Sequence, residues 1–488
     1  MNLGPLQLLE RAAQAWPDNT AVREDERTTT FAELWELSRA CALEPGARTI
    51  LLTAGGREAL TRYTSIQRAG GVVVELNPTL PDPELIAILR AAEPSGALSD
   101  EDSRPRLKAL WREAFAADVP WLEATSERPQ EDLPARGPAS LVFTSGTTGA
   151  PKGVRLSHEN LAAVTAAIAA SFELEPPNAG ESAKREVFLA GLPLYYTYGR
   201  SVVFLAAALG AELVFTSRAL TPGRVVSLTR EHAVTHLSLV PYQALALLRR
   251  PEFSASELTS VKRVTVAGGA LPEASLAELI ARFPGAVFPM YGLTEAATRL
   301  TCLHPREFAG RPRSCGRAIA GVELAVADEH GAQLAPGDAG EILARGPNLT
   351  AGYFGDPAGT GELFQEGWLR TGDLGVLDAE GYLTIQGRLK DLIKCMGERF
   401  SGQSIEDVVL ELPGVVEAAA IGVPDLERGE AVVLFVVSEG PIDEAALRAQ
   451  IAGRLGRAKV PVRVHALPEL PKTGSGKVRK SLLREPSA

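Results

Sequence analysis

The sequence predicts an α/β protein, with a large N-terminal domain of layered, mostly parallel sheets and a small C-terminal α+β domain. Two observations lead to this fold class. Up to about residue 318, short β-rich apolar runs alternate with Ala- and Leu-rich segments of helical period. Beyond that point the runs become alternating strands with Gly and Asp turns, and a compact α/β pattern follows Gly387. Strand–helix alternation on this scale is typical of parallel sheets covered by helices.

The individual elements follow from these patterns. Apolar runs of strand length lie at 49–53, 70–76, 139–144, 186–191, 211–216 and 261–268, and segments of helical period lie at 83–92, 160–170 and 242–250. Alternating runs at 318–328, 340–346 and 381–387 predict a smaller, β-barrel-like subdomain over about 318–388. After it, helices are predicted at 404–414 and 444–456, and strands at 415–425, 431–438 and 460–471. We therefore expect one domain over residues 1–388 and a second over residues 389–488.

Length, charge and cysteine content exclude several classes of protein. The chain has 488 residues, more than one hydrophobic core accommodates. Its 50 basic and 60 acidic residues give a net charge of −10, which argues against a nucleic-acid partner because such partners require a basic surface. No apolar run approaches the roughly 18 residues of a membrane span, and the first residues show no basic region followed by a long apolar stretch, so we do not expect secretion. Four scattered cysteines indicate reduced thiols, so a cytoplasmic location is expected.

A stretch rich in glycine and hydroxyl side chains, TSGTTGAPKG, occupies residues 144–153 directly after a predicted strand. Loops at this position bind nucleotides in parallel sheets. The stretch is not a Walker A motif, because Pro151 precedes its lysine and Gly153 follows it. Backbone amides of glycines, hydroxyls and a mobile ammonium group nevertheless suit phosphate. The candidate phosphate ligands are Thr144, Ser145, Gly146, Thr147, Thr148 and Lys152. A purely structural turn is the alternative that this stretch alone leaves open.

Six further motifs follow in order along the chain. They are VAGGALP (266–272), YGLTEA (291–296), GEILARGPNLTAGY (340–353), WLRTGDLG (368–375), IQGRLKDLIK (385–394) and LPKTGSGKVRK (470–480). Together with TSGTTGAPKGVRLSHEN (144–160), they resemble the motifs of the adenylate-forming, AMP-binding superfamily, which includes acyl- and aryl-CoA synthetases, stand-alone adenylation domains and luciferases. The resemblance extends from about residue 25 to residue 483, which is nearly the whole chain.

The resemblance implies a reaction in two halves. A carboxylate attacks the α-phosphate of MgATP, which releases pyrophosphate and leaves an acyl-adenylate. A thiol then attacks this mixed anhydride to give a thioester and AMP. The implied cofactors are ATP, Mg²⁺ and either coenzyme A or the phosphopantetheine of a carrier protein. The implied partner is a small organic carboxylic acid.

The resemblance also assigns roles to nucleotide-binding residues. Glu295, beside Thr294, would hold magnesium, because this ion needs few protein oxygens in addition to phosphate. Asp373 would accept hydrogen bonds from the ribose hydroxyls, and Arg388 would donate to the ribose. Tyr291 and Gly292 would lie on one face of the adenine, opposite the backbone of Gly268, Gly269 and Ala270. An exposed acid at a helix start and a surface arginine are the plain structural alternatives for Glu295 and Arg388.

Three lysines of the C-terminal part receive roles from the same resemblance. Lys477 would neutralise charge at the α-phosphate during adenylation, the alternative being an exposed basic tail. Lys390 falls at the hinge position, where a few residues absorb a large backbone change. The implied motion of the mobile C-terminal domain removes Lys477 from the site and brings in residues 394–400, so Lys394 is a candidate for the second half-reaction.

The acid pocket is predicted from a segment that departs from the family pattern. Tyr196 in LPLYYTYG (192–199) stands where a histidine is common. No Asp lies in this region, which argues against an α-amino acid, because its buried ammonium would need a carboxylate. Arg200 is either a pocket residue that recognises a second polar group or an arginine at the outer end of a helix. The predicted pocket residues are Tyr196, Gly199, Arg200, Val240 and Arg299; Glu75 replaces a common proline without an evident reason.

We therefore expect an acyl- or aryl-CoA synthetase. A stand-alone ligase that loads a carrier protein is the nearest alternative, and a catalytically silent nucleotide-binding homologue is a more distant one. The pattern leaves the acid open among aliphatic, aromatic and dicarboxylic compounds. It is compatible with a monomer or a homodimer.

Overall fold

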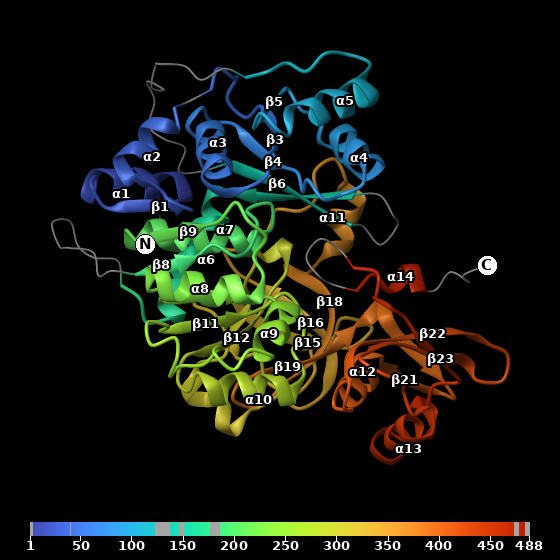
Figure 1. The fold of residues 1–488 in the computed structure, drawn as a ribbon. Coiled ribbons are helices and arrows are strands. Elements are labelled where there is room, and N and C mark those ends of the chain that lie inside the picture. Colours follow the sequence, from blue (N-terminus) through green and yellow to red (C-terminus); the bar gives the residue numbers. More distant parts are fainter. Residues whose placement is uncertain are drawn as a thin grey trace.

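A computed structural model describes residues 3–39, 41–122, 137–145, 151–175, 186–472 and 478–483. Two mostly parallel sheets make up the larger part of the chain (Figure 1). Within the described residues, the larger sheet has the strand order β14-β13-β12-β11-β10-β8-β9-β1-β2. Its strands are β1 (Thr20–Glu24), β2 (Arg27–Thr30), β8 (Val187–Leu189), β9 (Glu212–Phe215), β10 (His236–Leu239), β11 (Arg263–Val266), β12 (Val287–Tyr291), β13 (Thr301–Cys302) and β14 (Arg317–Ala318). Only the pairs β1–β2, β12–β13 and β13–β14 are antiparallel.

The second sheet has the order β5-β3-β4-β6-β7. Its strands are β3 (Arg48–Leu52), β4 (Val72–Glu75), β5 (Gly96–Ser99), β6 (Pro138–Ser145) and β7 (Pro151–Ser157), and the edge pair β6–β7 is antiparallel. Helices cover both sheets: α1 (Pro5–Ala15), α2 (Phe31–Leu37), α3 (Gly56–Arg68), α4 (Asp82–Ala92), α5 (Arg104–Phe115), α6 (His158–Ser171), α7 (Thr197–Leu209), α8 (Pro222–His232), α9 (Pro241–Leu248), α10 (Glu273–Arg282), η1 (Thr294–Ala296) and η2 (Pro305–Gly310).

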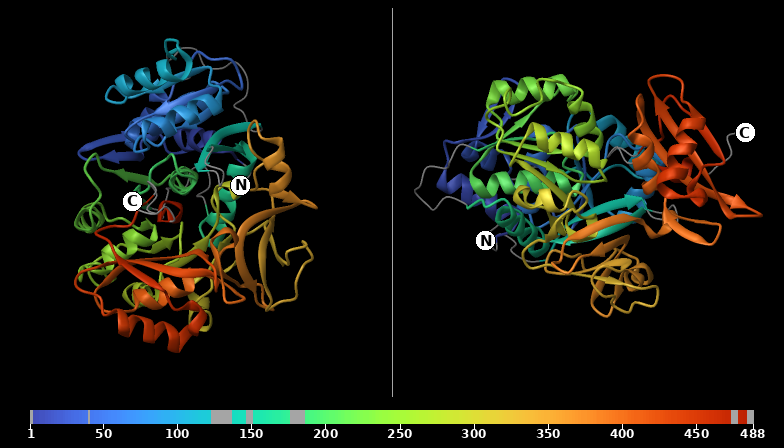
Figure 2. Two further views of the ribbon diagram at one scale, coloured as in Figure 1. Left: turned by 90° about the vertical axis from the view of Figure 1, so that its right-hand side faces the viewer. Right: turned by 90° about the horizontal axis from the view of Figure 1, so that it is seen from below.

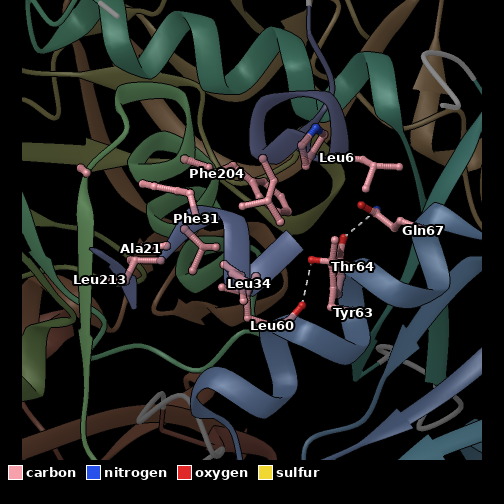
Figure 3. A pocket seen from close by; sticks show the side chains of 15 residues that line it. Leu6, Ala21, Phe31, Leu34, Leu60, Tyr63, Thr64, Gln67, Phe204 and Leu213 are labelled. Atoms are coloured by element: carbon pink, nitrogen blue, oxygen red, sulfur yellow. Dashed lines mark hydrogen bonds between the residues drawn. The ribbon is translucent and has the colours of Figure 1, made fainter. Parts of the chain in front are cut away.

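Helix α7 is the central helix of this part of the molecule. Every residue from Tyr198 to Leu209 is buried, because the helix is apolar on all sides and packs into a core shared by both sheets. A small apolar cavity lies between α7 and the helices α1, α2 and α3 (Figure 3). Its lining includes Phe31, Leu60 and Phe204 but none of the predicted site residues, so we regard it as a packing cavity.

Two further sheets follow toward the C-terminus. The first is antiparallel and comprises β15 (Glu323–Ala327), β16 (Ala339–Arg345), β17 (Phe364–Gln365), β18 (Trp368–Leu377) and β19 (Leu383–Arg388), with α11 (Pro357–Leu363) before β17. The second comprises β20 (Leu392–Cys395), β21 (Glu398–Ser401), β22 (Val415–Asp425), β23 (Gly429–Ser438) and β24 (Arg463–Ala466). The accompanying helices are η3 (Leu389–Asp391), α12 (Gln403–Leu410), α13 (Glu444–Leu455), η4 (Arg457–Lys459) and α14 (Lys480–Leu483).

The elements after η3 form a body at one side of the molecule (Figure 2). It has its own hydrophobic core, which includes Ile393, Val409 and Leu434. Among the described residues, three ion pairs connect this body to the rest of the chain: Arg479–Glu84 at 3.3 Å, Arg399–Glu329 at 3.5 Å and Arg249–Glu439 at 3.9 Å. All six side chains are at least 36% exposed.

The predicted fold class is confirmed: layered parallel sheets, an antiparallel β-rich region and a C-terminal α+β region are all present. The domain boundary at residue 388 stays a prediction. No helix in the described ranges is long and apolar enough to cross a membrane. All four cysteines are free.

Candidate active site

The predicted site residues follow the carboxyl ends of neighbouring parallel strands. Strands β8, β10, β11 and β12 are mutually parallel in register, so the segments that follow them emerge at one edge of the sheet. These segments hold Tyr196, Val240, Gly268 and Glu295. Ligands of open α/β sheets bind at this edge. The fold therefore brings motifs that are far apart in the sequence to a common edge.

Tyr291, Asp373 and Arg388 form a hydrogen-bonded group at this edge. Tyr291 ends β12, and its hydroxyl donates to Asp373 Oδ2 at 2.6 Å. The register of β18 and β19 places Asp373 opposite Arg388, whose Nε lies 2.7 Å from Asp373 Oδ1. Burial, and then the nearby Asp373, raises the pKa of Tyr291 well above its ordinary value, so its hydroxyl remains a donor. The carboxylate of Asp373 thus holds the side chains of Tyr291 and Arg388 in place. The contacts expected of these three residues with the adenine and the ribose of a nucleotide stay predictions.

Two glycines shape the backbone near this group. Gly268 has a φ of +91°, which favours glycine. A Cβ at this position would lie 3.3 Å from Val240 Cγ1, so glycine allows the loop after β11 to pack against the residue that follows β10. A Cβ on Gly292 would lie 1.9 Å from the carbonyl oxygen of Thr298. Gly269 and Ala270, which follow Gly268, are exposed. Their backbone is therefore open to a ligand at this edge.

A second group of side chains lies where the phosphate chemistry was predicted. Tyr353 donates its hydroxyl hydrogen to Glu295 Oε1 at 2.9 Å. The Lys152 ammonium lies 4.8 Å from the centre of the Tyr353 ring and 3.9 Å from Asp356 Oδ2. Glu295 is on the short helix η1, next to the half-buried Thr294. Lys152, Tyr353 and Glu295 thus place a cation, a hydroxyl and a carboxylate side by side.

Glu295 suits a magnesium ion. Magnesium in nucleotide sites takes one or two carboxylates together with phosphate oxygens and water. The hydrogen bond from the Tyr353 hydroxyl is accepted by Oε1 of this carboxylate. Among the described residues, no cluster of three or more His, Cys, Asp or Glu side chains offers an alternative metal site. A single half-buried carboxylate beside a lysine therefore fits a metal that arrives with its nucleotide.

The hairpin of β6 and β7 positions the two ends of the phosphate loop. Thr144 pairs with Lys152 and Ser145 with Pro151 in the antiparallel register. The predicted ligands Gly146, Thr147 and Thr148 lie outside the described residues. Thr144 is half-buried at the end of β6. The two residues that flank the undescribed part of the predicted phosphate loop, Ser145 and Pro151, are therefore paired neighbours.

Lys477 also lies outside the described residues, but the chain on both sides of it is defined. Lys472 and Val478 form an isolated antiparallel bridge. Arg479 then donates to Glu84 Oε1 on α4, and α4 packs against β7, the strand of Lys152. Arg479, two residues after Lys477, therefore contacts the N-terminal part close to the phosphate strand. Lys390 in η3 and Lys394 on β20 are both exposed, and no ion pair between described residues involves either side chain.

The start of α7 forms the predicted wall of the acid pocket. Tyr196 is the N-cap residue, and Asn77 Nδ2 donates to its hydroxyl at 3.3 Å. A Cβ on Gly199 would lie 2.1 Å from the carbonyl oxygen of Pro193, so only glycine permits this packing. Val240 is the N-cap residue of α9, beside the Gly268 loop. Arg299 is buried at 3% exposure.

Arg200 is neither a pocket residue that recognises the substrate nor an arginine at the outer end of a helix, the two alternatives that the sequence left open. It is 1% exposed and therefore is not at the outer end of a helix. Its Nη2 lies 3.5 Å from Glu75 Oε2, and Nε and Nη1 donate to Leu194 O and Ser140 Oγ. Because these contacts are all inside the protein, Arg200 does not act as a free pocket arginine. The unexplained Glu75 is its counterion.

This buried pair gives a prediction about stability. Glu75→Gln should lower the free energy of unfolding by about 3 kcal/mol, because Arg200 would keep a buried charge without a partner. The double variant Glu75→Leu/Arg200→Met should lose less than the single variant. Urea unfolding of wild type and variants at one pH measures both losses; equal losses in the single and double variants would contradict the pairing.

Tyr353, Asp356 and Glu75 are the site-supporting residues that the sequence interpretation missed. Tyr353 ends the motif at 340–353, to which the sequence interpretation assigned no residue role, although its aromatic hydroxyl at the end of a family-like motif was a visible signal. Asp356 caps the start of α11 through Gly359 N, as an Asp before Pro often does. Nothing in the sequence pairs Glu75 with Arg200.

Comparisons with known proteins agree with this geometry. A feruloyl-CoA synthase from Amycolatopsis sp is 32% identical over 489 residues, which cover 97% of this chain and 97% of that protein. A 2-succinylbenzoate–CoA ligase from Bacillus cereus is 30% identical over 492 residues, which cover 99% of each chain. Among solved structures, the o-succinylbenzoate coenzyme A synthetase from Bacillus subtilis in complex with ATP and magnesium ion has a TM-score of 0.85 at 26% identity, covering 98% of this chain and 99% of that chain.

Two family models match the chain itself. The model of the AMP-binding enzyme matches residues 9–354, and that of the AMP-binding enzyme C-terminal domain matches residues 404–477. The chain belongs to the AMP-binding enzyme family, which confirms the predicted resemblance to the adenylate-forming superfamily. Within that family it is an AMP-forming ligase of the acyl-CoA synthetase type.

Proposed function

We propose that the enzyme uses ATP and Mg²⁺ to convert an organic carboxylic acid into an acyl-adenylate, and that it then transfers the acyl group to coenzyme A. The observation that carries this proposal is the arrangement of two side-chain groups at one sheet edge. Tyr291, Asp373 and Arg388 suit a nucleoside. Lys152, Tyr353 and Glu295 suit phosphates and a divalent cation. The predicted acid pocket follows neighbouring strands of the same edge.

In the first half-reaction, a carboxylate oxygen of the acid forms a bond to the α-phosphorus of ATP. The bond between that phosphorus and the bridging oxygen breaks, and pyrophosphate leaves with the electron pair. Lys152 and the phosphate loop would hold the leaving pyrophosphate, and Glu295 would hold Mg²⁺, which supplies charge neutralisation at the phosphates when bound. Lys477 would offset charge at the α-phosphate. Phosphoryl transfer needs mainly this positioning and charge compensation.

In the second half-reaction, the sulfur of coenzyme A attacks the acyl carbon of the adenylate. The thiol loses its proton, the bond to AMP breaks, and a thioester forms. Lys390 would act as the hinge that lets the C-terminal part turn, and Lys394 would then approach the site. Lys390 lies in η3, directly before the C-terminal body, and Lys394 lies on β20, the first strand of that body. Both side chains are exposed, which supports these roles.

The relatives support coenzyme A as the acceptor. The two similar proteins compared above carry the names feruloyl-CoA synthase and 2-succinylbenzoate–CoA ligase. We therefore propose coenzyme A ahead of the phosphopantetheine of a carrier protein. An aromatic acid is the first class to test, since both names contain an aromatic acid.

ATP–pyrophosphate exchange tests the first half of this proposal. The purified enzyme is supplied with ferulate, 2-succinylbenzoate, benzoate, straight-chain fatty acids and dicarboxylates, with a no-acid reaction as background. We expect at least one acid to raise exchange by about tenfold or more. The best acid is then used to form the adenylate, and coenzyme A or a carrier protein is added. Thioester formation with the carrier protein alone would replace the proposed acceptor, and an absence of exchange with every acid would favour a silent homologue.

A further inference from the structure

Arg299 is a buried arginine without a carboxylate partner. It is 3% exposed, and among the described residues none of its contacts is to an Asp or Glu. Its Nη1 makes long hydrogen bonds to the carbonyl oxygen and the hydroxyl of the preceding Thr298, at 3.3 and 3.4 Å. Its Nε is buried and has no hydrogen-bond partner among the described residues, a condition that it shares with Nη2 of Arg200. An isolated buried charge carries a large desolvation penalty, so an arginine in this state requires compensation.

The other buried arginine of this region shows what compensation looks like. Arg200 has Glu75 at 3.5 Å and donates to two further oxygen atoms. Arg299 has instead the ring of Tyr198, 4.2 Å from its guanidinium carbon. A cation–π contact is weaker than a buried ion pair and does not replace a counterion. No anion that would balance Arg299 is present among the residues that the structure describes.

Arg299 lies against the inner wall of the predicted acid pocket. Tyr198, which covers it, is one residue before Gly199 on α7. The Tyr198 hydroxyl shares a 2.7 Å hydrogen bond with Thr265 Oγ1, on the strand that leads into the Gly268 loop. Thr265 Oγ1 lies 3.0 Å from Ser238 Oγ, two residues before Val240. The polar cluster of Arg299, Tyr198, Thr265 and Ser238 is thus located behind the predicted wall residues.

The backbone at Arg299 is held in a strained conformation. Ala297 has a φ of 48° and Thr298 a φ of 105°, although a β-branched residue disfavours positive φ. Asn348 Nδ2 fixes this turn by donating to the carbonyl oxygens of Ala296 and Arg299, at 3.0 and 2.7 Å. Such strain persists where the surrounding structure imposes it and is concentrated at functional sites. Here it directs Arg299 inward beneath Tyr198.

From this geometry we infer that Arg299 is an anion-recognition residue at the inner end of the acid pocket, and that the preferred acid carries a second carboxylate. The first carboxylate would face the α-phosphate, and the second would supply the counterion that Arg299 lacks. A planar guanidinium pairs with a carboxylate through two parallel hydrogen bonds, which makes arginine selective for this group. The inference rests on the proposed function and names the substrate class of that same pocket.

Matched pairs of acids test the inference. Succinate, glutarate, adipate and phthalate are each compared with their own monoamide, which keeps the size and removes the second charge. In ATP–pyrophosphate exchange we expect wild type to prefer the best diacid over its monoamide by about 50-fold or more in kcat/KM. Arg299→Met should lower kcat/KM for that diacid by a similar factor, with the KM for ATP within about twofold of wild type. Arg299→Lys should retain part of the preference.

Thermal unfolding separates recognition from a structural role. Without ligand, Arg299→Met should be at least as stable as wild type, because the change removes an uncompensated buried charge. The diacid should raise the melting temperature of wild type and not that of Arg299→Met. Arg200→Met is the matched control: it should lower the melting temperature, because Glu75 loses its partner, and should leave the diacid preference in place.

Two outcomes would overturn the inference. One is an unchanged ratio of diacid to monoamide activity in Arg299→Met; the other is a large loss of stability in Arg299→Met without a change in ligand response. Efficient exchange with monoacids alone in wild type would reject the second carboxylate while leaving the proposed function intact. Absence of exchange with every acid would reject the proposed function, and in that case diacid-induced stabilisation that depends on Arg299 would still support an anion site.

Discussion

Lys477→Ala is expected to lower the rate of acyl-adenylate formation by about 10³-fold. The reason is that an ammonium group carried to the α-phosphate offsets charge that develops only as the phosphorus–oxygen bonds exchange. A single-turnover experiment with ATP and the best acid, followed by quenching, measures this rate. Thioester formation from supplied acyl-adenylate should stay within about threefold of wild type, because the lysine acts on the first half-reaction only.

Lys472, earlier in the same sequence motif, offers a matched control. Lys472 pairs with Glu417 inside the C-terminal body and reaches no described residue of the N-terminal part. Lys472→Ala removes an equal charge and should leave both half-reactions within about threefold of wild type, since exposed ion pairs contribute little. If Lys477→Ala slowed both half-reactions equally, its assignment to one step would be wrong. If Lys472→Ala matched Lys477→Ala, the effect would come from the loss of a positive charge in this motif and not from Lys477 in particular.

Glu295→Gln is expected to lower kcat/KM for ATP by about 10²-fold and to raise the magnesium concentration needed for half-maximal exchange. Glutamine keeps the size of the side chain and an oxygen for the Tyr353 hydroxyl, but it lacks the negative charge that a hard divalent cation prefers. Exchange rates measured over a magnesium titration, at saturating acid, give both quantities. An unchanged magnesium dependence would contradict the assignment of Glu295 as the metal ligand.

Tyr353→Phe is the control for this prediction. It removes the 2.9 Å hydrogen bond to Glu295 and keeps the ring that Lys152 faces at 4.8 Å. We expect a loss of about fivefold, in line with one hydrogen bond that orients a charged group. A loss as large as that of Glu295→Gln would show that the tyrosine hydroxyl acts directly on the nucleotide.

The fold was predictable because its signals are local. Strands such as β3 and β4 are continuous apolar runs, and α6 starts at a capping box formed by Ser157 and Asn160. The motif residues were predictable for a related reason, since each motif lies in a short segment with its own composition. Tyr291 and Asp373 were assigned separately, and the structure then placed them in one hydrogen-bonded group.

What the sequence could not predict depends on pairs that are distant along the chain. Arg200, on helix α7, was left between two alternatives because its counterion, Glu75, is on the distant strand β4. Arg299 was predicted as a pocket residue, but the absence of an acidic partner is visible only when its neighbours from α7 are in place. Tyr353 was missed because its role requires the position of Glu295. In each case the missing information was a contact between separate elements.

The three exposed ion pairs between the C-terminal body and the rest of the chain have a consequence for measurement. Each such pair contributes roughly 0–1 kcal/mol, and dissolved salt weakens it within a Debye length of about 8 Å at physiological ionic strength. These pairs by themselves therefore resist separation of the C-terminal body only weakly. If the body turns at Lys390 as proposed, dissolved salt should shift the balance between its arrangements, and turnover numbers should then be compared at one ionic strength.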